Sequence, residues 1–241
     1  MQKRIQIIDA LRGLAVILMV IHHALFDAVE FYGAPAWLFT NPVFDVLHWF
    51  FAGVFIFLCG VSSRFSRSNL KRGLKTAIAA AVVSLVTWAV GEPILFGILH
   101  LLAVCMIVYG VIRIIIPASN KPLSPAGGTT AQPIIWIALI IASALAVKYV
   151  AVSVDWLWVF GWTYPGFYSA DYFPLLPWVF VFALGTWAGK PIRDGKLPQW
   201  FYETRVAFLP GVGRHSFIIY LAHQPILYGV PLLVMKLVGD R

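Results

Sequence analysis

The stretch RIQIIDALRGLAVILMVIHHALFD (4–27) is apolar enough to cross a membrane, yet it carries the ionisable residues Asp9, Arg12, His22, His23 and Asp27. A helix of about 20 residues crosses a hydrocarbon core of ~30 Å. A charged side chain in that core costs about 3 kcal/mol on insertion scales, so such residues persist where they face a protein interior or a water-filled cavity. We therefore expect this segment to be a membrane helix that lines a site.

The composition extends this inference to the whole chain. Hydrophobic residues make up 61% of the 241 residues and charged residues 12%, and the mean hydropathy is +0.85. These values are typical of a polytopic membrane protein. We predict an all-α bundle of transmembrane helices that forms a single domain over residues 1–241.

Apolar runs of membrane length predict seven spans, near residues 8–30, 42–63, 75–91, 97–117, 133–152, 172–189 and 214–237. Most of the 18 Lys and Arg residues lie in four segments between them, 1–7, 64–75, 113–131 and 190–214. Cytoplasmic loops are enriched in Lys and Arg, so we expect a cytoplasmic N-terminus and an extracytoplasmic C-terminus. The net charge of +8 then reflects topology, and it does not indicate binding to nucleic acid.

Other segments carry weaker signals. Residues 118–132 are rich in Pro, Gly, Ser and Thr and predict a cytoplasmic linker. The aromatic loop 156–178 suits an interfacial belt or the rim of a glycan-binding mouth. Cys59 and Cys105 fall within apolar spans, so neither a disulfide framework nor a cysteine metal site is indicated.

Several His and carboxylate residues are expected near the outer ends of the spans. Helical geometry places His23 about 16 Å outward of Arg12 on nearly the same face, with Asp27 one turn further out. Asp45 and His48 form an i, i+3 pair, and His100 opens the fourth span. A carboxylate beside an imidazole suits a general base. The alternative is that these groups only satisfy one another between helices.

The inner ends carry a different chemistry. Arg64, Arg67, Arg113 and Arg214 lie at or beside the ends of spans, and Gly and Ser residues accompany them. Cationic side chains beside a helix N-terminus can receive phosphate groups. Ser216, Tyr220 and His223 share one face of the last span, where interhelical hydrogen bonding is as good an explanation as a function.

Five stretches carry a resemblance to a known family. They are RIQIIDALRGLAVILMVIHH (4–23), FFAGVFIFLCGVSSRFS (50–66), ILFGILHLLAVCMIVYGV (94–111), YFPLLPWVFVFALGTWAG (172–189) and GRHSFIIYLAHQPIL (213–227). The chain resembles the transmembrane acyltransferases related to heparan-α-glucosaminide N-acetyltransferase, which include small bacterial members. The resemblance implies an enzyme of a bacterial inner membrane. It implies transfer of an acyl group, typically acetyl, from cytoplasmic acyl-CoA to an acceptor on the far side, such as an amino sugar or an envelope glycan.

The resemblance and the residues together predict two sets of site residues. The catalytic set is His23, Asp27, His48, Asp45 and His100, with one imidazole as general base; the set for acetyl-CoA is Arg12, Arg64, Arg113, Arg214 and Ser216. No metal is expected, and a homo-oligomer is compatible with the short chain. Direct transfer and a covalent acyl-histidine intermediate are both open.

The chain also departs from the known relative. That relative has Asn where His23 falls, and its proposed active-site His lies in the following loop, where residues 28–41 contain none. Two other functions are open at this point. One is a proton-coupled transporter that uses Arg12, His23 and Asp27 as a relay, and the other is a redox protein with b-type haem held by His residues.

Overall fold

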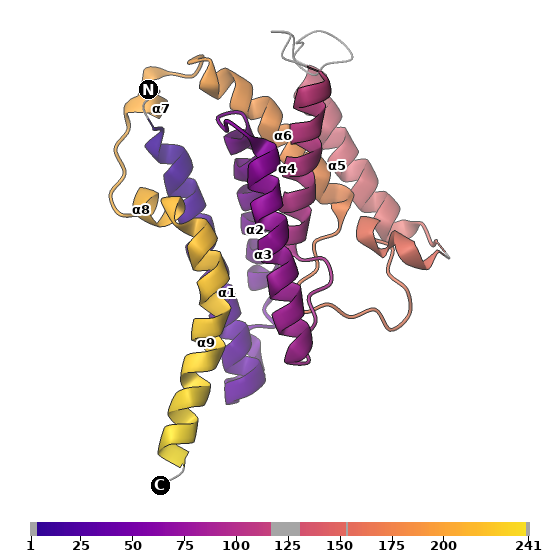
Figure 1. Cartoon of the computed structure of the whole chain (residues 1–241), viewed down its shortest axis with the longest axis vertical. Coiled ribbons are helices and arrows are strands. Elements are labelled where there is room, and N and C mark those ends of the chain that lie inside the picture. Colours follow the sequence, from indigo (N-terminus) through magenta and orange to yellow (C-terminus); the bar gives the residue numbers. More distant parts are fainter. Residues whose placement is uncertain (1–3, 117–130, 153, 240–241) are drawn as a thin grey trace. The chain divides into compact units, whose positions relative to one another are not determined.

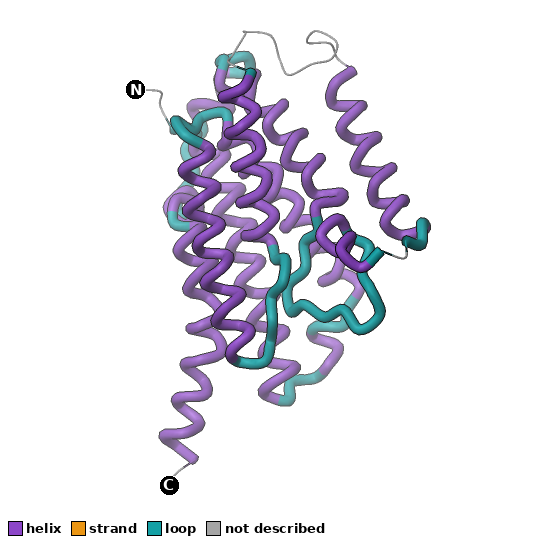
Figure 2. The backbone as a smooth tube through the Cα atoms, turned by 45° about the vertical axis from the view of Figure 1, so that its right-hand side comes forward, coloured by secondary structure: helices purple, strands orange, loops and turns teal. Residues whose placement is uncertain are grey.

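A computed structural model describes residues 4–116, 131–152 and 154–239. Within these ranges the chain is helical and has no strand, apart from one isolated bridge between Phe96 and Tyr172 (Figure 2). The α-helices are α1 (Gln6–Tyr32), α2 (Pro42–Ser63), α3 (Asn69–Ala89), α4 (Ile98–Ile115), α5 (Ala131–Tyr149), α6 (Leu175–Arg193), α7 (Gln199–Glu203), α8 (Leu209–Arg214) and α9 (Ser216–Gly239). Two short 3-10 helices, η1 (Ala36–Leu38) and η2 (Asp155–Phe160), precede α2 and α6. The predicted all-α class is confirmed.

Six segments in the described part of the chain are long and apolar enough to cross a membrane: α1, η1 with α2, α3, α4, α5 and α6. The seventh predicted span, 214–237, corresponds to α9, which is helical; its crossing of the membrane and the orientation of both termini stay predictions. Most of the predicted linker 118–132 lies outside the described residues. Its last two positions, however, already belong to α5.

Two predicted boundaries were displaced by local backbone chemistry. The third span was expected from residue 75, but α3 begins at Asn69 because the Ser68 hydroxyl accepts a hydrogen bond from the backbone N–H of Lys71 at 3.2 Å. Hydropathy misses this basic first turn because it registers only apolar residues. The expected last span is preceded by a separate short helix, since α8 ends at Arg214 and α9 begins at Ser216.

The chain, whose helices are labelled in Figure 1, divides into two compact units, unit 1 with residues 1–55 and 197–241 and unit 2 with residues 56–196. In unit 1, α1 packs against α8 and α9. Small residues allow the backbones of α1 and α8 to approach closely: a Cβ atom on Gly213 would lie 1.8 Å from the carbonyl oxygen of Asp9, and one on Gly13 would lie 2.2 Å from that of Leu209.

We expect Gly213→Ala to destabilise unit 1 strongly, because the added methyl group meets backbone atoms that have no rotamer to change. Overpacking typically costs 1–3 kcal/mol, and we expect about 3 kcal/mol here. Thermal unfolding of the detergent-solubilised protein measures the effect. Gly211→Ala in the same helix is the matched control, because nothing lies within 4 Å of its added Cβ. Equal stability of the two variants would contradict this packing.

In unit 2, α3 packs against α4, α5 against α6, and α4 against α6. The side chains of Ile56, Val61 and Leu101 in its core are at most 1% exposed. Close backbone contact also joins the end of α2 to α6, since a Cβ atom on Gly185 would lie 2.1 Å from the carbonyl oxygen of Phe57. These contacts gather the last residues of α2, α4 and α6 and the first residues of α3 at one end of the unit.

Candidate functional site

A polar cavity of about 320 Å³ lies at that end of unit 2, and we call it the basic pocket. Its lining comes from the end of α2, the turn into α3 and the ends of α4 and α6. The residues are Ser63, Arg64, Ser66, Arg67, Ser68, Asn69, Leu70, Tyr109, Gly110, Arg113, Ile114 and Arg193. The pocket therefore combines several guanidinium groups with the N-terminus of a long helix, whose exposed N–H groups and dipole favour an anion.

Two contacts hold Arg64 in the pocket wall. Its Nε donates a hydrogen bond to the carbonyl oxygen of Thr186 at 2.7 Å, and its guanidinium lies over the Tyr109 ring, 5.7 Å from the centroid. Burial lowers the pKa of this arginine from its usual value, although an arginine stays charged at neutral pH. With Nε engaged, its two terminal nitrogens are the donors available to a ligand.

Polar contacts also hold the rest of the pocket wall. Asn69 is buried, and its side chain donates to the carbonyl oxygen of Ser63 at 2.8 Å. Arg193 pairs with Asp194 at 3.3 Å, and Lys190 reaches the same carboxylate at 3.2 Å. The hydrogen bonds from Lys190 and then Arg193 hold the pKa of Asp194 below its usual range. This carboxylate stays ionised and offsets only part of the positive charge of the pocket.

Four histidines of unit 1, which we call the histidine cluster, come from three helices: His22 and His23 from α1, His48 from α2 and His223 from α9. The His22 and His48 rings stack with centroids 4.2 Å apart. The His23 and His223 rings meet edge to face at 4.8 Å, and His22 lies 5.7 Å from His23. A continuous group of imidazoles therefore joins α2, α1 and α9.

Hydrogen bonds to the backbone set the tautomer of two of these rings. His23 Nδ1 lies 2.9 Å from the carbonyl oxygen of Met19, and His223 Nδ1 lies 2.5 Å from that of Tyr220. A carbonyl oxygen only accepts, so in each neutral ring Nδ1 carries the hydrogen and Nε2 keeps its lone pair. Both rings thus present a basic nitrogen.

The two carboxylates expected to support these imidazoles, Asp27 and Asp45, differ in burial. Asp27 is 2% exposed, and its two oxygens have no hydrogen-bond partner among the described residues. Asp45 is exposed and lies three residues before His48 in α2. The Nδ1 of His23 is therefore oriented by the backbone and not by Asp27.

His100 belongs to unit 2, whereas the histidine cluster belongs to unit 1. Its Nδ1 accepts a hydrogen bond from the backbone N–H of Gly97 at 3.2 Å, and its Nε2 lies 3.1 Å from the Ser84 hydroxyl. Asp171 accepts from the backbone N–H of Ile98 at 3.0 Å in the same turn. These contacts cap the N-terminus of α4, which is a structural use of both side chains.

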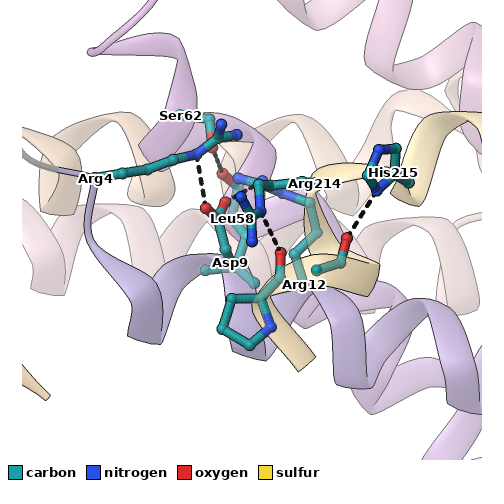
Figure 3. A network of polar contacts seen from close by, with 9 residues as sticks. Arg4, Asp9, Arg12, Leu58, Ser62, Arg214 and His215 are labelled. Atoms are coloured by element: carbon teal, nitrogen blue, oxygen red, sulfur yellow. Dashed lines mark hydrogen bonds and ion pairs between the residues drawn. The ribbon is translucent and has the colours of Figure 1, made fainter. Parts of the chain in front are cut away.

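Three other residues predicted to bind acetyl-CoA belong to unit 1 and are not among the residues that line the basic pocket: Arg12, Arg214 and Ser216. Arg12 donates to Asp9 at 3.0 Å, and the buried Asp9 carboxylate also pairs with Arg4 at 2.8 Å (Figure 3). Arg214 is exposed and its Nε donates to the carbonyl oxygen of Pro210 at 3.1 Å, while Ser216 is buried. Arg64 and Arg113 therefore share one pocket of unit 2, whereas Arg12, Arg214 and Ser216 belong to unit 1.

Arg193, His22 and His223 contribute to these groups but are not among the predicted site residues. The sequence indicates Arg193 only as a cytoplasmic charge, although its position at the end of an apolar run resembles that of Arg113. His22 is ionisable, but the stripe from Arg12 continues through its neighbour His23. Within the described residues, no group of three or more His, Cys, Asp or Glu side chains is arranged to hold a metal ion.

Fold and sites together define a multi-pass helical membrane protein with a cluster of imidazoles in one unit and a basic pocket in the other. The chain matches the family described as heparan-alpha-glucosaminide N-acetyltransferase, catalytic, over residues 4–225. It therefore belongs to this family of transmembrane acetyltransferases, as the sequence motifs predicted. No curated protein and no solved structure gave a match.

Proposed function

We propose that the protein is an integral membrane acyltransferase that uses acetyl-CoA from the cytoplasm and acetylates an extracytoplasmic acceptor. The acceptor offers an amino or hydroxyl group, as in an amino sugar or a cell-envelope glycan. Membership of the acetyltransferase family supports the reaction class. The basic pocket is the observation that carries the choice of donor.

The pocket suits the phosphate groups of CoA on chemical grounds. Arginine binds phosphate oxygens through paired N–H donors, and such charge-assisted hydrogen bonds are roughly twice as strong as neutral ones. Arg64, Arg67, Arg113 and Arg193 supply this chemistry, and Ser68 begins the helix whose N-terminus adds to it. Of the residues predicted to bind acetyl-CoA, Arg64 and Arg113 are therefore the first that we propose to contact its phosphates.

The histidine cluster suits the chemical step. In this proposal the Nε2 atom of His23 takes the proton from the acceptor while the acceptor attacks the thioester carbonyl carbon. The new bond to the acyl carbon forms, the C–S bond breaks, and the proton ends on the sulfur of CoA. General base catalysis of this kind contributes roughly 10²–10⁴-fold, and the backbone bond to Met19 keeps the basic nitrogen free for it.

The two other functions have less support. A haem iron held by two imidazoles lies between the rings, whereas the rings of His22 and His48, and of His23 and His223, are in direct contact. A transporter using Arg12, His23 and Asp27 as a proton relay gives no role to the basic pocket. Proton uptake by proteoliposomes without any acyl-CoA would favour the transporter.

Donor binding and transfer test the proposal directly. The purified protein in nanodiscs is incubated with radiolabelled acetyl-CoA, in competition with CoA or with pantetheine, which lacks the phosphates. We expect CoA to compete and pantetheine to compete poorly, and we expect label to appear on amino sugars added as acceptors. Absence of both binding and transfer would contradict the acyltransferase function.

A further inference from the structure

We propose that His223 is a second acid–base residue of the reaction and shares the transferred proton with His23. This inference rests on the proposed acyltransferase function. It concerns a side chain of α9, far from His23 in sequence, which the fold brings against it with ring centroids 4.8 Å apart and planes at 78°.

The burial of His223 points to a functional use. His223 is only 7% exposed, and its Nε2 atom has no hydrogen-bond partner among the described residues. A histidine that only tied helices together would use this nitrogen in a hydrogen bond, because an unsatisfied buried polar atom destabilises the fold. The Nε2 atom of His223 therefore lowers the stability of the fold, and it remains available to a proton.

The rings of His23 and His223 also have the same neutral tautomer. Both donate Nδ1–H to a carbonyl oxygen of their own helix, Met19 for His23 and Tyr220 for His223. Both therefore hold a lone pair on Nε2 in the neutral form. A pair of bases with the same tautomer can hold one proton between them, and each returns to its starting state when that proton leaves.

A shared proton solves a problem of the proposed step. When His23 takes the proton from the acceptor, it becomes an imidazolium within a bundle of apolar helices, where a lone charge is costly. His223 can accept a hydrogen bond from that imidazolium or take over the proton. The proton then passes to the sulfur as the C–S bond breaks, so that CoA leaves as the thiol and both rings end neutral.

The geometry of the His23–His223 pair differs from that of the other ring pair, His22 and His48. Their rings stack at 4.2 Å with planes 29° apart, so they meet through their faces. Stacked rings direct their in-plane nitrogens past one another, whereas the 78° angle between His23 and His223 turns the edge of one ring toward the other, so a small rotation of either ring can bring the two Nε2 atoms within reach of one proton. We therefore assign to His223 the role of sharing the transferred proton with His23.

Kinetics of His223→Gln and His223→Ala test this role, with donor binding measured on the same preparations. We expect kcat to fall by roughly 10²-fold, the lower end of the range for acid–base groups, with the Kd for acetyl-CoA unchanged. Added imidazole should restore part of the rate of His223→Ala. The matched control is His215→Ala: its Nδ1 also bonds to a backbone carbonyl, that of Gly211 at 2.9 Å, but its side chain is exposed. We expect this control to keep the wild-type rate.

Each outcome has a defined meaning. A kcat of His223→Gln within threefold of the wild-type value would overturn the role of His223 and leave the acyltransferase function standing. Loss of rate together with loss of thermal stability, without rescue by imidazole, would show a structural role and would also overturn it. A wild-type protein that binds no acetyl-CoA and transfers no acetyl group would instead contradict the proposed function.

Discussion

Replacing His23 by alanine is expected to lower the rate of acetyl transfer by roughly 10²–10⁴-fold, the range for loss of a general base. The reason is that His23 offers a free Nε2 atom, whose availability depends on the hydrogen bond from Nδ1–H to the carbonyl oxygen of Met19. Donor affinity should not change, because His23 is not among the residues that line the basic pocket. Steady-state kinetics with a parallel acetyl-CoA binding assay measure both quantities.

His23→Asn is the sharper companion variant. Its side-chain amide can still donate a hydrogen bond to the carbonyl oxygen of Met19, but it has no basic nitrogen. We expect the asparagine variant to be as inactive as the alanine variant. An asparagine variant with nearly wild-type activity would show that His23 serves only to hold the helix, and the base would then have to be sought elsewhere in the cluster.

Replacing Arg64 by alanine is expected to raise the Kd for acetyl-CoA by about 10- to 100-fold. A hydrogen bond to a charged group contributes about 1.5–3 kcal/mol, and about 1.4 kcal/mol corresponds to a tenfold change in Kd. Arg64→Lys should lose most of this affinity too, because lysine keeps the charge but cannot hold both Thr186 and a phosphate through one planar group. Filter binding of radiolabelled acetyl-CoA measures the change.

Two controls isolate the phosphate contact. Lys75→Ala removes an exposed positive charge from α3 outside the lining of the basic pocket, and we expect donor affinity to stay near the wild-type value. Acetyl-pantetheine, which lacks the phosphates of CoA, should be used equally well by the wild type and by Arg64→Ala. An Arg64→Ala variant with unchanged affinity for acetyl-CoA would contradict the proposed donor site.

Some of the residues predicted to act together do lie together in the structure, while their role in a site stays a prediction. Arg64 and Arg113 were expected to bind phosphate and do line one pocket, because arginines at membrane boundaries stand out against apolar spans. His23 and His48 were expected at similar depth and do belong to one cluster. Nothing in the local sequence pattern of their partners Arg193 and His223 indicates which residues they meet.

For Arg12 the structure shows a local partner. Its position in the first helix predicted a contact with the donor, and the structure bonds it to Asp9, three residues away. Ion pairs at i, i+3 are available to any helix, so this local pairing was visible in the sequence. Whether Arg12 also meets the donor stays a prediction.

The sequence by itself determined the class of the protein, its all-helical structure, most of its helices and its family, because hydropathy and short motifs depend on neighbouring residues. Only the tertiary structure decided which polar side chains meet. His223 reaches His23 because α9 packs along α1, and Arg193 reaches the basic pocket because α6 ends beside α2. These contacts follow from the packing of helices distant in sequence, and no periodicity within one helix specifies its neighbours.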